Sequence, residues 1–554
     1  MLNNLKFLLV SFLVTWTTLS WSQSNPNENT EVESLQLPKD WFNLDPQANG
    51  VMGTSADKAH EFLLNDKSPK TTVIVAVIDS GVDIEHEDLK GKIWVNEDET
   101  PGNGKDDDGN GYIDDVNGWN FIGGKDGTNV EADSYELTRE YSRLKPIYGE
   151  LEEEQIKKKQ ENEYRYWLTI QKQFEETKKE AEMNLEYTST LQENLTEVAE
   201  MVKSALGKDD FTAEDLEGLD QGEEEVKKAG FMLSQLFNNI GDGAGINEIL
   251  EELADAVAHY KNQVEFAYNP DFDPRHIVGD DPNNYKERIY GNNDVKGPDS
   301  RHGTHVSGII AANRNNSLGI RGITEHALIM PIRAVPDGDE RDKDIANAIY
   351  YAVDNGADII NMSFGKSYSP GKKYVDKAVR YAKRKGVILI HAAGNSGEEV
   401  TAVNNFPNKW LKKRNKLFGK DRVASNWVEV GASSWQGNEN LPGSFSNYSG
   451  KAVDLFAPGV DVYSTVPGNE YQSNSGTSMA APVVSGVTAM ILAYYPDLKP
   501  SEIKEILSKS VYNQSNQRVI KPGKDEEVSF GSLSITGGLV NAYQALELAE
   551  SLSK

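Results

Sequence analysis

The stretch TVIVAVIDSG, residues 72–81, decides the fold. Its first seven residues, Thr72 to Ile78, form a nearly continuous run of branched apolar side chains. Such a run predicts a strand buried on both faces, as in a parallel sheet covered by helices. The run ends at Asp79 and is followed by a glycine turn, so a carboxylate lies at the carboxyl end of a buried strand. Functional sites form at this end of parallel α/β sheets.

Beyond residue 300 the chain alternates between strand and helix patterns. The apolar runs predict strands at 328–335, 358–364 and 387–393, and the helical periodicity predicts helices at 343–355, 374–385, 478–495, 501–510 and 540–551. A short helix capped by Ser55 is predicted at 55–66. The alternation indicates an α/β fold with a mainly parallel sheet and helices on both faces.

One long segment has a different composition. Residues 131–268 are rich in Glu, Lys, Gln and Leu, and Leu191, Leu195 and Val198 share one helical face. We predict an all-α insertion of three or four helices, with a plain charged amphipathic hairpin as the alternative. The predicted organisation is a signal peptide at 1–22, an N-terminal leader at 23–54, the first part of the α/β domain at 55–130, the insertion at 131–268 and the second part of the domain at 269–554.

Composition and the N-terminus favour an exported protein. The net charge of -30 disfavours binding to nucleic acid or anionic membranes, and no cysteine is present, which excludes disulfides and thiol chemistry. Lys6, an apolar stretch at 7–19 and small residues at 20–22 predict a signal peptide, with a membrane anchor as the alternative. No other segment is predicted to span a bilayer. We expect a periplasmic or extracellular location.

Two further segments carry chemistry. In HGTHVSG, residues 302–308, His302 opens an apolar helix and suits the role of general base, although His302 and His305 could instead bind one metal. In SGTSMAAP, residues 475–482, Ser478 stands at a helix N-terminus, where free N–H groups can stabilise an oxyanion. A simple helix cap is the alternative for Ser478.

Taken together, and in the order Asp, His, Ser, the three segments resemble the signatures of the subtilisin family of serine peptidases. The resemblance spans about 55–95 and 297–545. It implies a three-layer subtilisin-like fold and a serine endopeptidase that hydrolyses protein or peptide substrates through an acyl-enzyme on Ser478. His302 would move the proton and Asp79 would hold its tautomer.

Two more segments extend the resemblance to substrate binding. AAGNS, residues 392–396, resembles the family's oxyanion-hole segment, so Asn395 would donate its amide beside the N–H of Ser478, with a turn residue as the alternative. NMSFG, residues 361–365, resembles the strand that pairs with the substrate backbone. The substrate-binding residues implied are Ser363, Phe364, Gly365 and Gly394.

Calcium is the predicted cofactor. DDDGNGYIDD, residues 106–115, fits the opening of an EF-hand-type loop, although position twelve is Asn117 rather than Glu, and an acidic surface turn is the alternative. The ligands expected there are Asp106, Asp108, Asn110 and Asp114. The family resemblance implies a second site, with Asp88 and Asn316 as side-chain ligands.

The chain departs from the family pattern in two places. The 223-residue separation of Asp79 and His302 includes the insertion, which we expect near the rim of the site as a gate, a partner-docking element or a propeptide-like folding aid. The stretch before Asp79 is too short for a folding propeptide. The rival hypotheses are a binding protein on an inactive protease scaffold and a structural envelope protein. The acidic run from Asp337 to Asp344 suggests tolerance for basic substrate residues.

Overall fold

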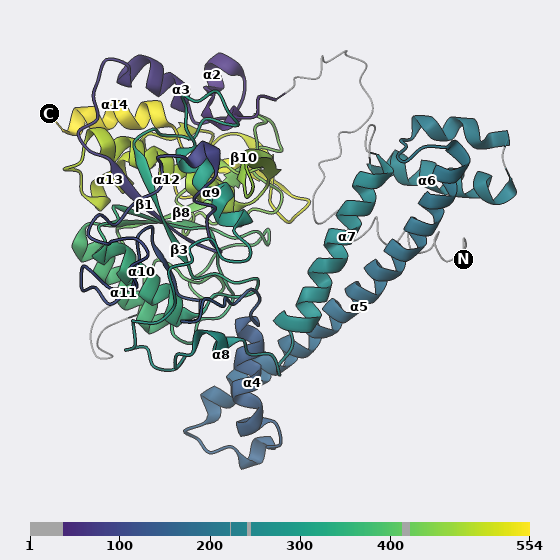
Figure 1. The fold of residues 1–554 in the computed structure, drawn as a ribbon, viewed down its shortest axis with the longest axis horizontal. Helices are drawn as coiled ribbons and strands as arrows, with labels where there is room; N and C mark the ends of the chain where they lie inside the picture. Colours follow the sequence, from purple (N-terminus) through teal and green to yellow (C-terminus); the bar gives the residue numbers. More distant parts are fainter. Residues whose placement is uncertain (1–36, 222, 241–244, 413–421, 554) are drawn as a thin grey trace. The chain divides into compact units, whose positions relative to one another are not determined.

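The computed structural model describes residues 37–553 except 222, 241–244 and 413–421, and it forms two units (Figure 1). We call the first the α/β unit, which comprises Asn25–Glu136 and Asp273–Lys554, and the second the helical unit, which contains Leu137–Phe272. The predicted signal peptide and the leader up to residue 36 lie outside the described residues.

A nine-stranded sheet forms the middle of the α/β unit, in the order β12-β15-β9-β8-β5-β4-β1-β3-β2. Strand β1 (Val73–Asp79) pairs in parallel with β3 and β4, and the parallel pairing continues through β5, β8, β9 and β15, whereas β12 pairs antiparallel. The predicted α/β fold class is therefore confirmed. The other bounds are β2 Trp119–Asn120, β3 Ala327–Arg333, β4 Ile359–Met362, β5 Ile388–Ala392, β8 Trp427–Ser433, β9 Leu455–Pro458, β12 Tyr512–Asn513 and β15 Gly538–Leu539.

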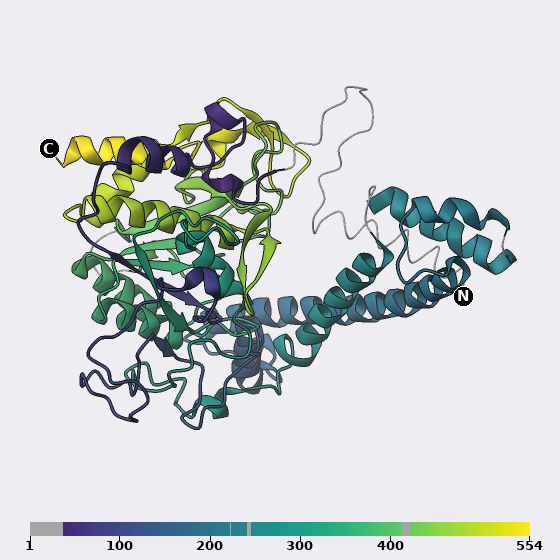
Figure 2. The same cartoon turned by 45° about the horizontal axis from the view of Figure 1, so that its top comes forward.

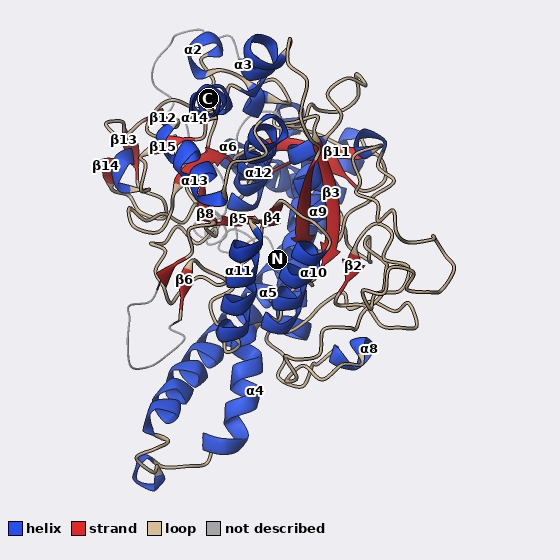
Figure 3. Cartoon of the chain, turned by 90° about the vertical axis from the view of Figure 1, so that its left-hand side faces the viewer, coloured by secondary structure: helices blue, strands red, loops and turns tan. Residues whose placement is uncertain are grey.

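Helices cover both faces of this sheet. Val73, Val75 and Val77 of β1 lie in a core shared with α9, α12, α13 and α14, while Ala76 and Ile78 lie in a second core shared with α10 and α11. Figure 3 shows α10 and α11 on one side of strands β4, β5 and β8 and α12 and α13 on the other. The bounds are α9 Arg301–Ala311, α10 Asp342–Asp354, α11 Lys372–Lys385, α12 Thr477–Tyr494, α13 Pro500–Lys509 and α14 Ala542–Leu552.

Helix α12 is the most apolar of these. In the described part of the chain it alone meets the length and hydropathy of a membrane-crossing helix, and 89% of it is buried inside the protein. Its apolar side chains contribute to the same core as those of β1. A helix buried all round in a core needs apolar residues on every face.

Part of the predicted leader belongs to the folded core. Trp41 and Phe42 are 1% and 0% exposed. Asp45 caps α2 (Pro46–Asn49) by accepting hydrogen bonds from two backbone N–H groups of its first turn. Ser55, predicted as a helix cap, precedes α3 (Ala56–Ala59) but makes no capping bond; its Oγ instead accepts a hydrogen bond from Asn541 Nδ2 at 3.0 Å.

The helical unit contains all but the first residue of α4 (Glu136–Tyr148), together with α5 (Glu161–Leu206), α6 (Glu224–Ile240) and α7 (Ile246–Asn262). Helices α5 and α7 run side by side, which both Figure 1 and Figure 2 show. Leu191, Leu195 and Val198 face the same core as Leu233 and Leu253 from α6 and α7. The helical face predicted from the sequence is thus the buried one.

The two ends of the helical unit are also tied together. The hydroxyl of Thr138 donates to the carbonyl of Ala267 at 2.6 Å, and that of Ser142 donates to the carbonyl of Pro270 at 3.1 Å. Tyr141 stacks on Phe174 with ring centroids 4.0 Å apart. These contacts therefore hold the first and last segments of the helical unit together.

Candidate active site

The carboxyl end of β1 and the first turn of α9 bring two predicted residues together. Asp79 is the last residue of β1, and His302 Nδ1 lies 2.7 Å from Asp79 Oδ1. Gly303 makes this approach possible, because a Cβ there would lie 2.1 Å from the carbonyl oxygen of Gly81. Asp79 Oδ1 also accepts the N–H of Ser80 at 2.8 Å, which fixes the carboxylate.

This contact sets the charge balance of His302. Burial lowers the pKa of the imidazole, but the charge and hydrogen bond of Asp79, helped by Asp299, raise the pKa above its ordinary value overall. The Asp79 side chain is 3% exposed, whereas the His302 side chain is 39% exposed. A buried carboxylate thus holds an imidazole that is still accessible to solvent.

Ser478 is the second residue of the buried helix α12. Its Oγ donates to the carbonyl oxygen of Ser363 at 3.0 Å, and the Ser363 hydroxyl donates back to the carbonyl of Ser478 at 2.8 Å. Asn361 Nδ2 in turn donates to Ser363 Oγ at 3.0 Å. Hydrogen bonds therefore hold the N-terminus of α12 at the end of β4.

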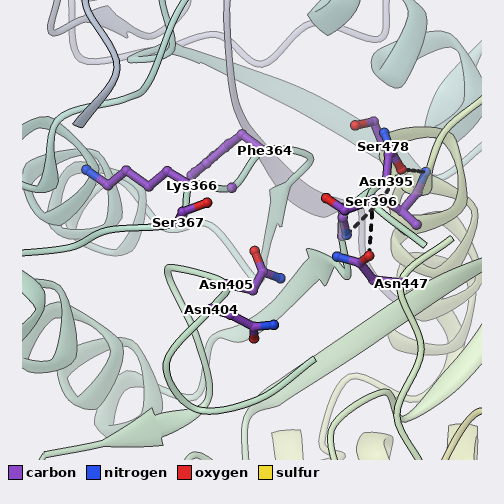
Figure 4. Close-up of a pocket in the computed structure, with 13 residues that line it drawn as sticks. Phe364, Lys366, Ser367, Asn395, Ser396, Asn404, Asn405, Asn447 and Ser478 are labelled. Carbon is purple, nitrogen blue, oxygen red and sulfur yellow. Dashed lines mark hydrogen bonds between the residues drawn. The ribbon is translucent and has the colours of Figure 1, made fainter. Parts of the chain in front are cut away.

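Asn395 follows β5 and lies beside Ser478 in the same pocket (Figure 4). Its Oδ1 accepts two hydrogen bonds from Thr477, from the backbone N–H at 2.9 Å and from the hydroxyl at 2.8 Å. These bonds leave the amide Nδ2 facing the other way, 3.3 Å from where a Cβ of Gly476 would lie. Thr477 thus orients the Asn395 amide, a role that the sequence reasoning missed.

The pocket beside these residues has a volume of about 190 Å³. Phe364, Gly365 and Gly394, predicted to bind substrate, line it, while Ser363 lies behind it through its bonds to Ser478. A side chain at Gly394 would collide with Asn447, because its Cβ would lie 2.5 Å from Nδ2. The lining residues that the sequence reasoning missed are Lys366, Ser367, Ala392, Ser396, Asn404, Asn405, Asn447 and Thr477.

The acidic loop brings three carboxylates together. Oxygen atoms of Glu99, Asp106 and Asp108 lie within 4.8 Å of one another. Asn110 contacts this group through its backbone N–H, which donates to Asp106 at 3.0 Å and to Asp108 at 2.9 Å. Asp114 instead accepts backbone N–H groups from the turn at 103–104. Glu99 lies outside the EF-hand-type pattern, so the motif could not reveal it.

Glu99 offers a free acceptor to this cluster. It is 6% exposed, and its Oε1 accepts the N–H of Asp107 at 2.8 Å. Its Oε2 is buried with no hydrogen-bond partner among the described residues. A buried carboxylate oxygen without a donor, next to two further carboxylates, matches the demand of a divalent cation for oxygen ligands.

The second predicted metal pair is also in contact. Asn316 Nδ2 donates to Asp88 Oδ1 at 2.7 Å, and the N–H of Ile320 donates to Oδ2 at 3.2 Å. Burial raises the pKa of Asp88. The amide of Asn316 presents its nitrogen to the carboxylate, so a cation here needs the amide turned over.

Two other sequence-based alternatives lose support from the contacts. His305 Nε2 lies 3.0 Å from the carbonyl of Gln472, and burial lowers the pKa of His305 to about 4, so it serves as a neutral core residue. In the acidic run, Asp344 pairs with Arg275 at 2.7 Å, and Asp342 accepts the N–H of Gly371 at 2.7 Å. Asp344 and Asp342 are 0% and 5% exposed and so are closed to a substrate, whereas Asp337 is exposed and Asp339 is half-buried.

This chain is similar in sequence to known proteases. The model of the subtilase family matches residues 70–531. A thermophilic serine proteinase of a Bacillus species is 38% identical over 40% of this chain and 48% of its own length. Thermitase of Thermoactinomyces vulgaris is 34% identical over 44% of this chain and 75% of its own. A solved protease from Pseudoalteromonas arctica is 27% identical, with a TM-score of 0.37 over 47% of this chain and 78% of that one.

The chain thus spans about half of the first relative and three quarters of the second. The family match covers β1, which ends at Asp79, and the helices α9 and α12, whose second residues are His302 and Ser478. This chain belongs to the subtilase family of serine-type endopeptidases.

Proposed function

We propose that this chain is an exported endopeptidase that cleaves protein or peptide substrates through an acyl-enzyme on Ser478. The observation that carries the proposal is the Asp79–His302 pair at 2.7 Å, at the same end of the sheet as the serine at the start of α12. An imidazole held by a buried carboxylate suits the role of the base that activates a serine.

In the first step Ser478 Oγ leaves Ser363, transfers its proton to His302 and attacks the scissile carbonyl. The imidazolium that forms is stabilised by Asp79, whose effect on the pKa of His302 already favours the protonated ring. His302 then gives the proton to the leaving amine, which departs. Water repeats the sequence and releases the acyl group from Ser478.

The oxyanion formed in each half-reaction needs donors that are already in place. The backbone N–H of Ser478 at the N-terminus of α12 and the Asn395 amide, oriented by Thr477, supply them. Residues Ser363 to Gly365 leave β4 beside the pocket and offer backbone groups to an extended substrate, as an added strand would use them. Gly394 keeps the facing wall close to Asn447.

The acidic loop is the proposed calcium site. Glu99, Asp106 and Asp108 would hold the ion, with the orphan Oε2 of Glu99 as the ligand prepared by burial. When bound, the ion would neutralise the negative charges of these three carboxylates in the acidic loop. Asp114 would stabilise the neighbouring turn. At the second predicted site, Asp88 and Asn316 would bind a cation only with the amide oxygen turned towards it.

Export is supported by the apolar segment at 7–19, which Lys6 precedes and small residues at 20–22 follow. For the helical unit we propose a role in limiting access to Ser478 or in folding, because it is inserted between the segments that carry Asp79 and His302.

A serine-directed fluorophosphonate probe tests the proposal. The wild-type protein should be labelled and should cleave denatured casein, and Ser478→Ala should lose both. Ser501→Ala is the matched control, since Ser501 is an exposed serine in the first turn of α13 and lies outside the pocket lining. Absence of labelling in the folded wild type would favour a binding protein on an inactive scaffold instead.

A further inference from the structure

A buried polar cluster lies behind the pocket beside Ser478. His391 on β5 and Glu429 on β8 are register partners in the sheet, and His391 Nδ1 lies 3.0 Å from Glu429 Oε1. The indole N–H of Trp427 donates to Glu429 Oε2 at 2.6 Å. All three residues are at most 2% exposed. Donors on both oxygens are what a carboxylate, rather than a carboxylic acid, requires.

Asn405 connects this cluster to the pocket. Its Nδ2 donates to the carbonyl of Ala393 at 3.0 Å and reaches Glu429 Oε1 at 3.4 Å. Both acceptors lie on the side of Asn405 that faces away from the pocket, so the NH₂ group of the Asn405 amide faces the buried cluster. Its Oδ1 faces the opposite way, because a Cβ added at Gly365 would come within 2.8 Å of that oxygen. The space beside Gly365 belongs to the pocket.

The backbone of Asn405 is held as firmly as its side chain. The next residue, Phe406, exchanges two hydrogen bonds with Lys366, at 2.8 and 2.9 Å. Asn408 Nδ2 donates to the carbonyl of Asn405 at 2.8 Å. Asn405 is 7% exposed. The amide therefore has no room to swing out of the pocket wall when a substrate side chain enters.

The positive charge of Lys366 does not cancel the negative polarity that Asn405 Oδ1 gives to this end of the pocket. Lys366 contributes to the pocket lining, but its side chain extends away from Ser478 and Asn395 (Figure 4). Its ammonium binds Glu136 Oε2 at 2.7 Å. The pocket end therefore presents a carbonyl oxygen with a buried carboxylate behind it, and both attract the positive end of an N–H bond.

We propose that Asn405 is a specificity-determining residue and that Glu429 is its positioning residue. Asn405 Oδ1 accepts a hydrogen bond from the substrate side chain immediately before the scissile bond, so the pocket selects side chains that end in an N–H donor. The proposal rests on the proposed peptidase function. A site that pairs a fixed acceptor with a substrate donor discriminates against an analogue that lacks the donor, since the acceptor is then left buried and unpaired.

The test uses peptides that differ only at this position, with Gln, Lys or the nearly isosteric but apolar Met. For the wild type we expect kcat/KM to favour Gln over Met by about tenfold, the effect of one hydrogen bond between neutral groups, and to favour Lys over Met by at least as much, because its donor is charged. Equal rates for Gln and Met would overturn the proposal. Absence of both fluorophosphonate labelling and cleavage of all three peptides would instead refute the peptidase function on which it rests.

Three variants separate the roles. Asn405→Leu keeps the volume and removes the acceptor, so the Gln-to-Met ratio should fall to about one; an unchanged ratio would refute the role of Asn405. Asn405→Asp should favour Lys over Gln. Glu429→Gln gives Asn405 Nδ2 a weaker acceptor and allows the amide to turn, so KM for the Gln peptide should rise while kcat for the Met peptide changes little.

Asn438→Ala serves as the matched control, because Asn438 is an exposed asparagine outside the pocket lining. It should keep the wild-type ratio. Each variant is checked by thermal unfolding and by fluorophosphonate labelling before its kinetics are compared. If Glu429→Gln does not fold, the two Asn405 variants still decide the proposal, since they leave the bonds between Glu429, His391 and Trp427 in place.

Discussion

Replacing Asp79 by Asn tests the centre of the proposed site. Asn preserves an oxygen that can accept the N–H of Ser80 and the Nδ1–H of His302, but it removes the negative charge. In that orientation the new NH₂ group occupies the position of Asp79 Oδ2, which is buried with no hydrogen-bond partner among the described residues. The substitution therefore alters charge while retaining shape.

The loss of kcat in Asp79→Asn can be calculated from the Coulomb interaction between Asp79 and protonated His302. Two unit charges about 4 Å apart interact by about 4 kcal/mol at an effective dielectric constant of about 20. Since about 1.4 kcal/mol corresponds to tenfold in rate, the imidazolium in the transition state should lose about 10³-fold in kcat. Loss of the correct tautomer in the other amide orientation would bring the decrease to about 10⁴-fold.

The pH profile supplies a second readout. In the wild type Asp79 raises the pKa of His302, so activity is lost as pH falls through a value above the ordinary pKa of His. In Asp79→Asn, burial remains as the main influence and lowers the pKa. The acid limb of kcat/KM should therefore move to lower pH, which a series of peptide hydrolysis rates would measure.

The control is Asp299→Asn, because Asp299 raises the pKa of His302 less than Asp79 does. It should keep near-wild-type kcat and shift the acid limb slightly. A kcat decrease of less than about tenfold in folded Asp79→Asn, or an acid limb that does not move, would refute the assigned role of Asp79. Thermal unfolding distinguishes lost catalysis from lost folding.

Three further predictions concern stability and access. Chelation should lower the Tm of the wild type and leave Glu99→Gln nearly unaffected, because that variant lacks the orphan ligand; equal shifts in calorimetry would contradict the calcium site. Burial lowers the pKa of His305 to about 4, below its unfolded value, so the unfolded state binds the proton first and stability should fall by about 3 kcal/mol between pH 6.5 and pH 4. In His305→Gln, the free energy of unfolding measured by urea titration should depend less on pH. An unchanged pH dependence would contradict the assignment of this loss to His305. Replacing 137–272 by a short linker should preserve hydrolysis of small peptides but alter cleavage of folded proteins. The two ends can be joined because Asp133 and Asp273 both bind Arg341. Unchanged folding yield and unchanged cleavage of large proteins would refute a gating or folding role.

The boundary of the helical unit shows how local pattern and tertiary structure differ. The sequence predicted an insertion at 131–268 from its composition, and the structure begins this unit at Leu137 and ends it at Phe272. Asp133 and Asp273 lie on the α/β side of these limits because both bind Arg341. Composition does not record such ion pairs, and its limits differ from those of the unit by six residues at the start and four at the end.

By itself, the sequence determined the buried strand of β1, the main helices after residue 300 and the order of Asp79, His302 and Ser478. These features are local, since hydrophobic periodicity and short motifs each extend over a few to about twenty consecutive residues. Only the tertiary structure decided that Glu99 joins Asp106 and Asp108 and that Glu429 turns the Asn405 amide towards the pocket. The first contact depends on how one loop folds back on itself, which the motif does not specify. The second joins a loop to a strand 24 residues further along the chain, and its hydrogen-bond direction arises only when the sheet is assembled.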